Sequence, residues 1–503
     1  MRWKKGWIWA MLLTSFGLAF AASGLQPFGN TVTPGAGLDA FAAFLDKQVP
    51  ELLLRYDIPG ASLALVANGE LAWSGAYGYA DAANQIPMTT KTTMRVQSIS
   101  KPITAWGVMR LVQTGKIDLD APAADYLTSW RFSQAAPGAE HITIRQLLSH
   151  TAGLPLGDVF TIYAPGEAMP SLREKLTAEA VPVREPGSSF SYSNTGYNLL
   201  ELLIEDVTGQ EFSDYMRQEV LRPLNMVRST FDWSDLDDLA IPVGYRLNGD
   251  PVPAYVYPEK GSGGLFATAE DLAAFAICGM INAPANAVLS RQAIEALHSP
   301  VSQAIGVYGL VFDGYALGHY VETLPGGHLA VAHGGQGTGI MTHYHAVPET
   351  GDALVILTNS QRSWPAIARL LCDWSRWRNL GTVGMGRIIW GQAMLWVLIG
   401  MVWSGGLVMC LRILQILVCK NKDSTLLSGT TRLGRILRIG AAVSIVAILA
   451  WCSSQRYLFL ASVFPRATEW LGVSLLVLAV VLLLTAAISR HLPRTKDRHL
   501  DCR

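Results

Sequence analysis

Ser98 and Lys101 have the residue types and the spacing of a catalytic pair. They lie in the run Gln97-Ser98-Ile99-Ser100-Lys101-Pro102. Residues three apart share one face of a helix, so the lysine amine can reach the serine hydroxyl. A serine hydroxyl becomes a good nucleophile when a base removes its proton, and a desolvated, neutral lysine is such a base. The pair therefore predicts attack of Ser98 on a carbonyl, with the amide groups of the helix start stabilising the oxyanion.

A second polar group, Tyr192-Ser193-Asn194, offers the remaining acid–base and amide-binding functions. A tyrosine beside a lysine ammonium can ionise below its usual pKa of about 10, so we expect Tyr192 to act as a general base. The amide of Asn194 can donate to and accept from a substrate amide. Taken alone, such a cluster is also typical of an ordinary loop.

The third group is His333-Gly334-Gly335-Gln336-Gly337, which directly precedes a predicted strand. Glycines at a strand edge allow a ligand to approach the main chain, and the edge itself can bind an extended substrate. A histidine beside glycines is also common as a purely structural residue.

Several local signals place these groups on an α+β framework. A helix is predicted from Ser98, with Pro102 in its first turn and Gly115 as its C-terminal stop. Residues 62–73 alternate around Asn68-Gly69, which predicts a hairpin. Further strands are predicted at residues 339–347 and 353–358. Because strands occur at both ends of this region with helices between them, we expect an antiparallel sheet flanked by helices and closed by its N- and C-terminal segments.

The composition of the 503-residue chain excludes some classes of protein. Its 39 basic residues equal its 39 acidic ones, so no electrostatic surface for nucleic acid is indicated. Only 16% of residues are charged and 50% are hydrophobic, which points to membrane segments. Cys278 and Cys372 of the polar region lack metal-ligand spacing and either form one disulfide or stay as buried thiols. We expect neither a cofactor nor a metal.

Apolar segments at both ends predict export and membrane anchoring. Residues 1–22 have the charged, apolar and small-residue order of a signal peptide or N-terminal anchor. Transmembrane helices are predicted at residues 387–411, 437–455 and 470–489, and the polar region at 30–380 lies between. Basic residues are concentrated between the first two spans and after the third, so these segments should be cytoplasmic and the polar region outside, in the periplasm of a bacterial inner membrane.

The three polar groups together resemble the penicillin-recognising serine hydrolases, in particular class C β-lactamases and related penicillin-binding proteins and esterases of the S12 peptidase type. Ser98-Ile99-Ser100-Lys101 resembles S-x-x-K, Tyr192-Ser193-Asn194 resembles Y-x-N, and His333-Gly334-Gly335 stands where β-lactamases have K-T-G. The resemblance covers about residues 38–380 and implies a β-lactamase/transpeptidase-like fold. Two accessory stretches, 147–155 and 261–272, also look like this family, and in the second Thr268 and Asp271 are predicted to cap a helix.

The resemblance implies an acyl-enzyme route in which Ser98 attacks and Lys101 and Tyr192 transfer the proton. It places the oxyanion between the main-chain N–H groups of Ser98 and Gln336, and it gives Asn194 the substrate amide. His333, Gly334 and Gly335 would line the substrate site. Histidine in place of lysine removes a fixed positive charge, which argues against a β-lactamase specialised for drug carboxylates.

An exported hydrolase with three C-terminal membrane helices is similar in architecture to the prodrug-maturing peptidases of nonribosomal peptide pathways, such as the colibactin-maturing type. The first hypothesis is therefore removal of an N-acyl-D-amino-acid cap from an exported small-molecule or short-peptide substrate, with the membrane helices available to a second copy or an exporter. Gly337 departs from the asparagine expected in the colibactin-type enzymes.

Two alternatives stay open at this stage. One is a cell-wall D-Ala peptidase, esterase or β-lactamase-like hydrolase that uses its helices only as an anchor. The other is a β-lactam-responsive membrane sensor, which needs a cytoplasmic output domain. The predicted cytoplasmic segments, 412–437 and 490–503, are shorter than the roughly 50 residues of a small domain.

Overall fold

The computed structural model describes residues 32–133, 138–236, 241–283, 286–418, 432–455 and 458–488. The chain divides into two compact units, a body at 30–389 and a second unit that includes residues 390–503. The predicted signal segment, 1–22, lies outside the described residues.

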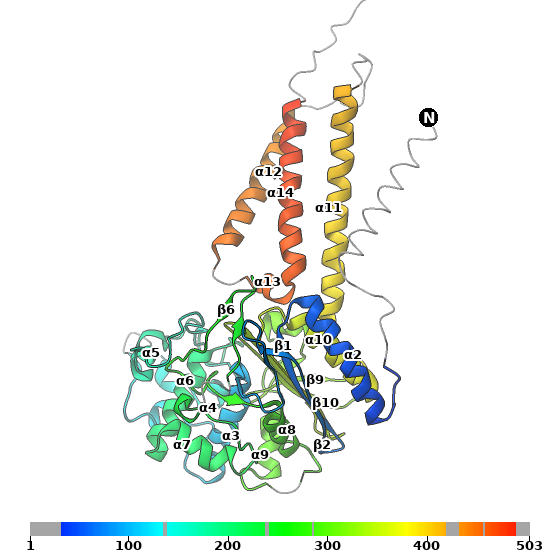
Figure 1. Ribbon diagram of the computed structural model, residues 1–503. Helices are drawn as coiled ribbons and strands as arrows, with labels where there is room; N and C mark the ends of the chain where they lie inside the picture. Colours follow the sequence, from blue (N-terminus) through cyan, green and yellow to red (C-terminus); the bar gives the residue numbers. More distant parts are fainter. Residues whose placement is uncertain are drawn as a thin grey trace, which may run out of the picture. The chain divides into compact units, whose positions relative to one another are not determined.

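The body is built on an eight-stranded sheet in the order β3-β2-β1-β12-β11-β10-β9-β8, with every pairing antiparallel (Figure 1). Strand β1 from the start of the body pairs with β12 from its end, as the sequence predicted. The strands of this sheet are β1 Gly60–Ala67, β2 Glu70–Asp81, β3 Ile86–Pro87, β8 Gly314–Tyr315, β9 Tyr320–Thr323, β10 Leu329–Gly337, β11 Ile340–Val347 and β12 Asp352–Thr358. Two small ribbons pair β4 Met94–Arg95 with β7 Phe266–Ala267 and β5 Gly244–Tyr245 with β6 Pro251–Val252.

Helices cover both faces of this sheet. Helices α2 and α10 pack on one face and α8 on the other, while α3 to α7 form a separate helical layer beside it (Figure 1). The helices of the body are α2 Leu38–Tyr56, α3 Ser100–Gln113, α4 Ile144–Leu148, α5 Leu172–Glu179, α6 Asn194–Thr208, α7 Phe212–Met216, α8 Ala269–Cys278, α9 Arg291–His298 and α10 Trp364–Trp377. The predicted α+β architecture is therefore confirmed.

The turn, the helix stop and the helix cap predicted from local sequence signals are all present in the structure. In the β1–β2 hairpin Asn68 and Gly69 have φ of 53° and 83°, the two positive values of a type I′ turn. Gly115 has φ of 70° directly after α3, where the chain leaves the helix. The side chain of Thr268 accepts a hydrogen bond from the main-chain N–H of Asp271 (3.1 Å), which confirms the predicted cap of α8.

The two cysteines of the body, Cys278 on α8 and Cys372 on α10, are free thiols, so the disulfide considered above is absent. The body continues to Ile389, beyond Leu380. Gly384 is held to the sheet because its main-chain N–H donates to Glu322 Oε2 of β9 (2.7 Å). The residues just after the predicted polar region, 30–380, are therefore part of the same fold.

Within the described residues three helices are long and apolar enough to cross a membrane. The spans are Gly386–Leu414 of α11 (Gly386–Val418), Arg432–Ser454 of α12 (Arg432–Ser454) and Pro465–Ala487 of α14 (Pro465–Ile488). A short helix, α13 (Phe459–Val463), precedes α14. Leucine, valine and alanine dominate α14, which leaves no polar face to be solvated, as expected for a helix surrounded by lipid.

Candidate active site

Ser98 lies in a short 3₁₀ turn, η1 (Gln97–Ile99), that leads directly into α3. The residue before it, Gln97, has φ of 55°, a value that costs a non-glycine residue on the order of 1 kcal/mol. Two hydrogen bonds hold this turn in place. The Ser100 hydroxyl donates to the Gln97 carbonyl (2.7 Å), and the Gln97 side-chain amide donates to the Tyr255 hydroxyl (2.7 Å). The strained turn therefore fixes the position of the Ser98 side chain, which lines a cavity together with Asn194 and Gln336.

Lys101 is fully buried and its Nζ lies within hydrogen-bond distance of three oxygens. These are Ser98 Oγ at 3.1 Å, Asn194 Oδ1 at 2.7 Å and the main-chain oxygen of Ser262 at 2.7 Å. Burial removes the ammonium from water and lowers the pKa of Lys101 well below its usual value. Lys101 is therefore disposed to be a neutral amine in the folded protein.

The three oxygens could each accept a hydrogen bond from an ammonium, and they also fit a neutral amine to which the Ser98 hydroxyl donates. Such an amine has two N–H donors and one lone pair, whereas an ammonium has three donors and no lone pair. The Ser262 carbonyl and Asn194 Oδ1 accept from the two N–H groups. The lone pair is left for the Ser98 hydroxyl, which can donate its proton to it. Lys101 is therefore positioned as a candidate base for Ser98.

The surroundings of Tyr192 shift its pKa in the direction opposite to the one that the sequence suggested. Burial raises the pKa of the Tyr192 phenol well above its usual value and the nearby Tyr308 raises it further, while a hydrogen bond with Ser98 opposes the rise. The sequence-based expectation of a lowered pKa was wrong because it assumed a charged lysine next to the ring. Tyr192 is a neutral hydroxyl that can pass a proton between groups but is not a phenolate base.

We expect Tyr192→Phe to slow acylation of Ser98 by about a hundredfold, the lower end of what a positioned acid or base contributes. The ring packing against His150 is kept, with centroids 4.3 Å apart, and only the hydroxyl beside Ser98 is lost. The rate of labelling by a fluorophosphonate and the rate of turnover measure this separately. Turnover that equals wild type would show that Lys101 moves every proton without help.

His150 positions the start of α6 and with it Asn194. It is buried with φ of 57°, and its Nδ1 accepts the main-chain N–H of Ser193 (3.1 Å). The Ser193 side chain in turn caps the helix by accepting the N–H of Gly196 (3.0 Å). The accessory stretch 147–155 therefore has a structural function, since it fixes Tyr192 and Asn194 against Lys101.

Glu201, about two turns after Asn194 on α6, binds the main chain just before Ser262. Its Oε2 accepts the main-chain N–H groups of Lys260 and Gly261, both at 2.7 Å. Burial raises the pKa of Glu201 to about 8, so its carboxyl is largely protonated at neutral pH. No sequence motif marked Glu201, whose partners lie 59 and 60 positions away in the chain.

This carboxyl makes the stability of the body depend on pH in a defined direction. Because its pKa is about 8 when folded against 4.5 for the free side chain, the native state binds more protons between these values. The stabilisation is fully present below pH 4.5 and is lost as the pH rises through about 8. Relative to Glu201→Gln, which has no charge to gain, the wild type should lose stability across that window.

Urea unfolding of both proteins at a series of pH values, followed by loss of fluorophosphonate labelling, measures this difference. Groups that titrate in both proteins cancel in the comparison. Glu201→Ala serves as the contrast, because it leaves two main-chain N–H groups without their acceptor. The free energy of unfolding should therefore fall by roughly 1–3 kcal/mol at every pH. A pH-independent difference between wild type and Glu201→Gln would mean that the carboxyl is not held neutral.

The remaining predicted residues divide between the cavity and the packing behind it. Ser98, Asn194 and Gln336 line one cavity together. His333, Gly334 and Gly335 are not among its described lining residues. His333 is buried with Nε2 3.3 Å from the Tyr315 hydroxyl, and burial lowers the pKa of its imidazole well below the usual value. It supplies no positive charge to the site.

Two glycines of this strand make room for the turn that carries Ser98, and one of them, Gly337, also lines the cavity. A Cβ on Gly335 would lie 2.2 Å from the Val96 carbonyl oxygen, and one on Gly337 would lie 2.3 Å from the Gln97 carboxamide. Close packing of β10 on η1 therefore requires glycine there. Strand β9 pairs with β10 only as far as Ala332, so the site-proximal end of β10 has an edge without that partner.

A buried lysine beside a serine, at the start of a helix next to an antiparallel sheet, is the arrangement of a serine hydrolase of the β-lactamase and penicillin-binding-protein class. The beta-lactamase family model matches residues 39–370, and the chain belongs to that family. The chain is 28% identical over 221 residues to the protein Flp of Staphylococcus aureus strain N315, which is 43% of either chain. It thus spans less than half the length of that relative.

Two solved structures share this fold. One is the octameric penicillin-binding protein homologue from Pyrococcus abyssi, with a TM-score of 0.57 and 26% identity over 66% of this chain and 77% of that one. The other is SurE with D-Leu, with a TM-score of 0.54 and 27% identity over 68% of this chain and 76% of that one. The resemblance inferred from the three motifs is confirmed at the level of family and fold.

Proposed function

We propose that this protein is a membrane-anchored serine peptidase that works through a Ser98 acyl-enzyme and cleaves an amide next to a D-amino acid. The observation that carries the acyl-enzyme part is the position of the buried Lys101 Nζ, 3.1 Å from Ser98 Oγ and 2.7 Å from both Asn194 Oδ1 and the main-chain oxygen of Ser262.

The reaction follows from this geometry. Ser98 Oγ bonds to the substrate carbonyl carbon as its proton moves to Lys101 Nζ, and the oxygen charge is held by the main-chain N–H groups of Ser98 and Gln336. The C–N bond breaks as the leaving nitrogen takes a proton from Lys101, directly or through the Tyr192 hydroxyl. Water then attacks the ester, with Lys101 again taking the proton, and releases the acid and Ser98.

Two features support a D-amino-acid substrate on an exported molecule. SurE, with the same fold and 27% identity, has been solved with D-Leu. The three candidate spans and the positions of the basic residues favour a body on the periplasmic side of an inner membrane. An N-acyl-D-amino-acid cap on an exported nonribosomal peptide prodrug fits both, and the membrane helices would then be available to an exporter or to a second copy of the chain.

A cell-wall peptidase acting on D-Ala peptides is the second candidate. It is favoured by the similarity to a penicillin-binding protein homologue at 26% identity. The two candidates share Ser98 chemistry and differ only in the group that the cavity accepts.

The test is mass spectrometry of the full chain in detergent after incubation with a fluorophosphonate, an N-acyl-D-asparagine amide or a D-Ala-D-Ala peptide. A label on Ser98 with cleavage of the asparagine substrate supports prodrug maturation. A label with cleavage of only the D-Ala peptide supports the wall enzyme. Absence of any label on Ser98 would contradict the acyl-enzyme proposal itself.

A further inference from the structure

The short 3₁₀ helix η7 (Gly306–Leu310) has an exposed apolar face. Side chains three apart in a 3₁₀ helix lie one above the other, so Val307 and Leu310 share this face. Val307 is 56% and Leu310 66% exposed, and no residue of η7 is buried. Residues 299–312 contain no charged side chain. Apolar groups exposed together in an uncharged segment point to an interaction surface.

Other side chains in and beside η7 fix it on the catalytic body. The Tyr308 ring packs against the rings of Tyr192 and Tyr320, with centroids 5.6 and 5.3 Å apart. Ile305 and Phe312, one on each side of the helix, are buried. The exposed face of η7 is therefore held in a defined position.

The end of η7 lies against the segment that leads into α11. Arg387 Nη1 donates to the main-chain oxygen of Leu310 (3.2 Å). Gly384 has no room for a Cβ, because the main-chain oxygen of Val311 lies against it. Since Gly386 begins both α11 and the first candidate membrane span, η7 lies beside the point at which the chain enters that span.

The length of this span places its first residues at the level of the lipid headgroups. It has 29 residues, Gly386–Leu414, which at about 1.5 Å per residue corresponds to about 43 Å. A bilayer with its headgroups is roughly 40–45 Å thick. Arg387 is exposed, and an arginine near the end of a membrane helix extends to the headgroups. Leu310, bound to Arg387, is therefore within reach of lipid.

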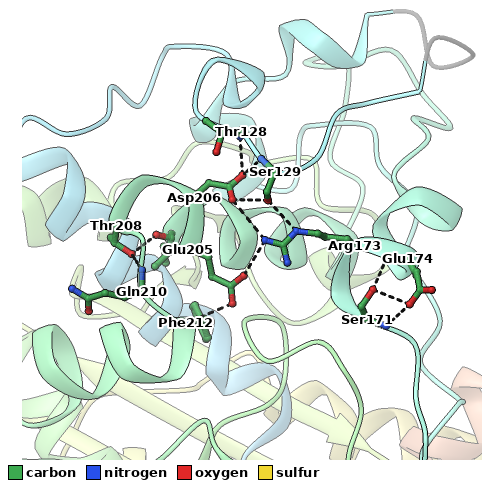
Figure 2. A network of polar contacts seen from close by, with 11 residues as sticks. Thr128, Ser129, Ser171, Arg173, Glu174, Glu205, Asp206, Thr208, Gln210 and Phe212 are labelled. Atoms are coloured by element: carbon green, nitrogen blue, oxygen red, sulfur yellow. Dashed lines mark hydrogen bonds and ion pairs between the residues drawn. The ribbon is translucent and has the colours of Figure 1, made fainter.

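The surface of the helical layer is different in kind. Figure 2 shows Arg173 of α5 between Glu205 and Asp206 of α6, with nitrogen–oxygen distances of 3.7 and 3.8 Å. The Ser129 hydroxyl also donates to Asp206 (2.6 Å), and Gln210 close by is exposed. Charged and hydrogen-bonding groups of this kind are typical of a surface in water. The uncharged face of η7 fits an apolar medium instead.

We propose that η7 docks on the membrane surface, with Val307 and Leu310 inserted among the lipid acyl chains beside the start of α11. The inference rests on the membrane anchoring in the proposed function and not on the hydrolase reaction. It follows from the exposed, uncharged face of η7 together with its hydrogen bond from Arg387. Because Tyr308 packs on Tyr192, the docked helix holds the catalytic residues close to the membrane surface.

The test is photocrosslinking of the full chain in vesicles of phosphatidylethanolamine and phosphatidylglycerol. The probe is p-benzoylphenylalanine, which reacts with nearby C–H bonds under ultraviolet light and replaces Val307 or Leu310 in separate proteins. Mass spectrometry measures the fraction of the probe peptide that carries a phospholipid. We expect a fraction about tenfold higher than with the probe at Gln210, because an inserted side chain stays at the acyl boundary.

Val227 is the matched control for apolar exposure, since it is 71% exposed against 66% for Leu310. A probe at Val227 should give as little lipid adduct as a probe at Gln210. Adduct at Val307 and Leu310 that does not exceed adduct at these two positions would overturn the docking proposal.

A probe at Met394 separates failure of docking from failure of anchoring. Met394 is 72% exposed and lies within the candidate span of α11, so it should react with lipid. Adduct at Met394 without adduct at Leu310 would reject docking alone. Absence of adduct at both would contradict the membrane anchoring as well. Neither result depends on whether Ser98 is labelled.

A second substitution tests whether the apolar face itself causes the contact. Val307→Gln, in the protein with the probe at Leu310, puts a polar group on the same face and should lower the lipid-bound fraction severalfold. Val227→Gln should leave that fraction unchanged. Both residues are exposed, so circular dichroism should show the same folded protein in each case. A fraction unaffected by Val307→Gln would show that the probe meets lipid only because α11 is near, and insertion of the face would be wrong.

Discussion

Ser98→Ala is expected to lower kcat/KM by at least about a thousandfold, because the proposed mechanism has no route to product without the acyl-serine bond. The hydroxyl is small and its removal leaves Lys101 with its two carbonyl partners, so the fold should be retained. Turnover of the peptide substrates and covalent labelling should therefore disappear together in a protein that expresses normally.

Two controls make this result specific. Ser234→Ala removes an exposed hydroxyl that interacts with Asp232 and should keep both turnover and label. The Ser98→Ala protein should unfold at the same urea concentration as wild type, within the small shift expected for loss of one partly exposed hydroxyl. Residual turnover above about one hundredth of wild type would contradict the acyl-enzyme route, because removing a nucleophile costs far more than this.

The elements that local rules govern could be predicted from the sequence. Asn68-Gly69 supplies the two positive φ values that a tight hairpin needs, and Ser98 and Lys101 meet because three residues make nearly one helical turn. The three apolar runs near the C-terminus indicated helices of membrane length, although α11 and α12 begin or end several residues away from the predicted limits. Their ends depend on polar residues that can continue a helix beyond the apolar run.

A desolvated lysine was expected from the chemistry, but its burial could not be derived from the sequence, because the enclosing segments lie far apart in the chain. The pKa of Lys101 is lowered because its side chain is enclosed, and one of its partners, the Ser262 carbonyl, lies 161 positions away. The same enclosure keeps Tyr192 protonated, opposite to the expectation from a charged neighbour. Gly335 matches a ligand-binding motif by sequence, but the space beside it is taken by Val96 of the nucleophile turn.

The sequence motifs also did not identify the acidic residues that line the cavity with Ser98. Asp158, Glu179 and Glu259 come from three separate segments, and each has an ordinary sequence context. Only Asn198, which also lines this cavity, had a usable signal, since it follows Asn194 by four residues and therefore shares its face of α6. A helical-face argument applied to the residues after a catalytic motif would have found it.

Lys101→Met and Lys101→Arg together test whether this lysine acts as a base or as a positive charge. Methionine is apolar and of similar length, so it fits the buried space but cannot take a proton, and we expect a loss of at least about a thousandfold in kcat/KM. Arginine keeps the charge and the donors but does not lose its proton in proteins. If the lone pair of Lys101 activates Ser98, both variants should be equally inactive.

The pH dependence of kcat/KM in the wild type tests the role of Lys101 independently of the two variants. Since burial lowers the pKa of Lys101 well below its usual value, kcat/KM should fall only when the pH drops below that lowered pKa, and full activity should not require a strongly alkaline solution. In Lys101→Met, kcat/KM should not show this fall at low pH, because the variant has no lysine to protonate. Activity in Lys101→Arg that exceeds Lys101→Met by more than about tenfold would instead assign the lysine a charge-stabilising role, and the proton would then have to leave Ser98 through Tyr192.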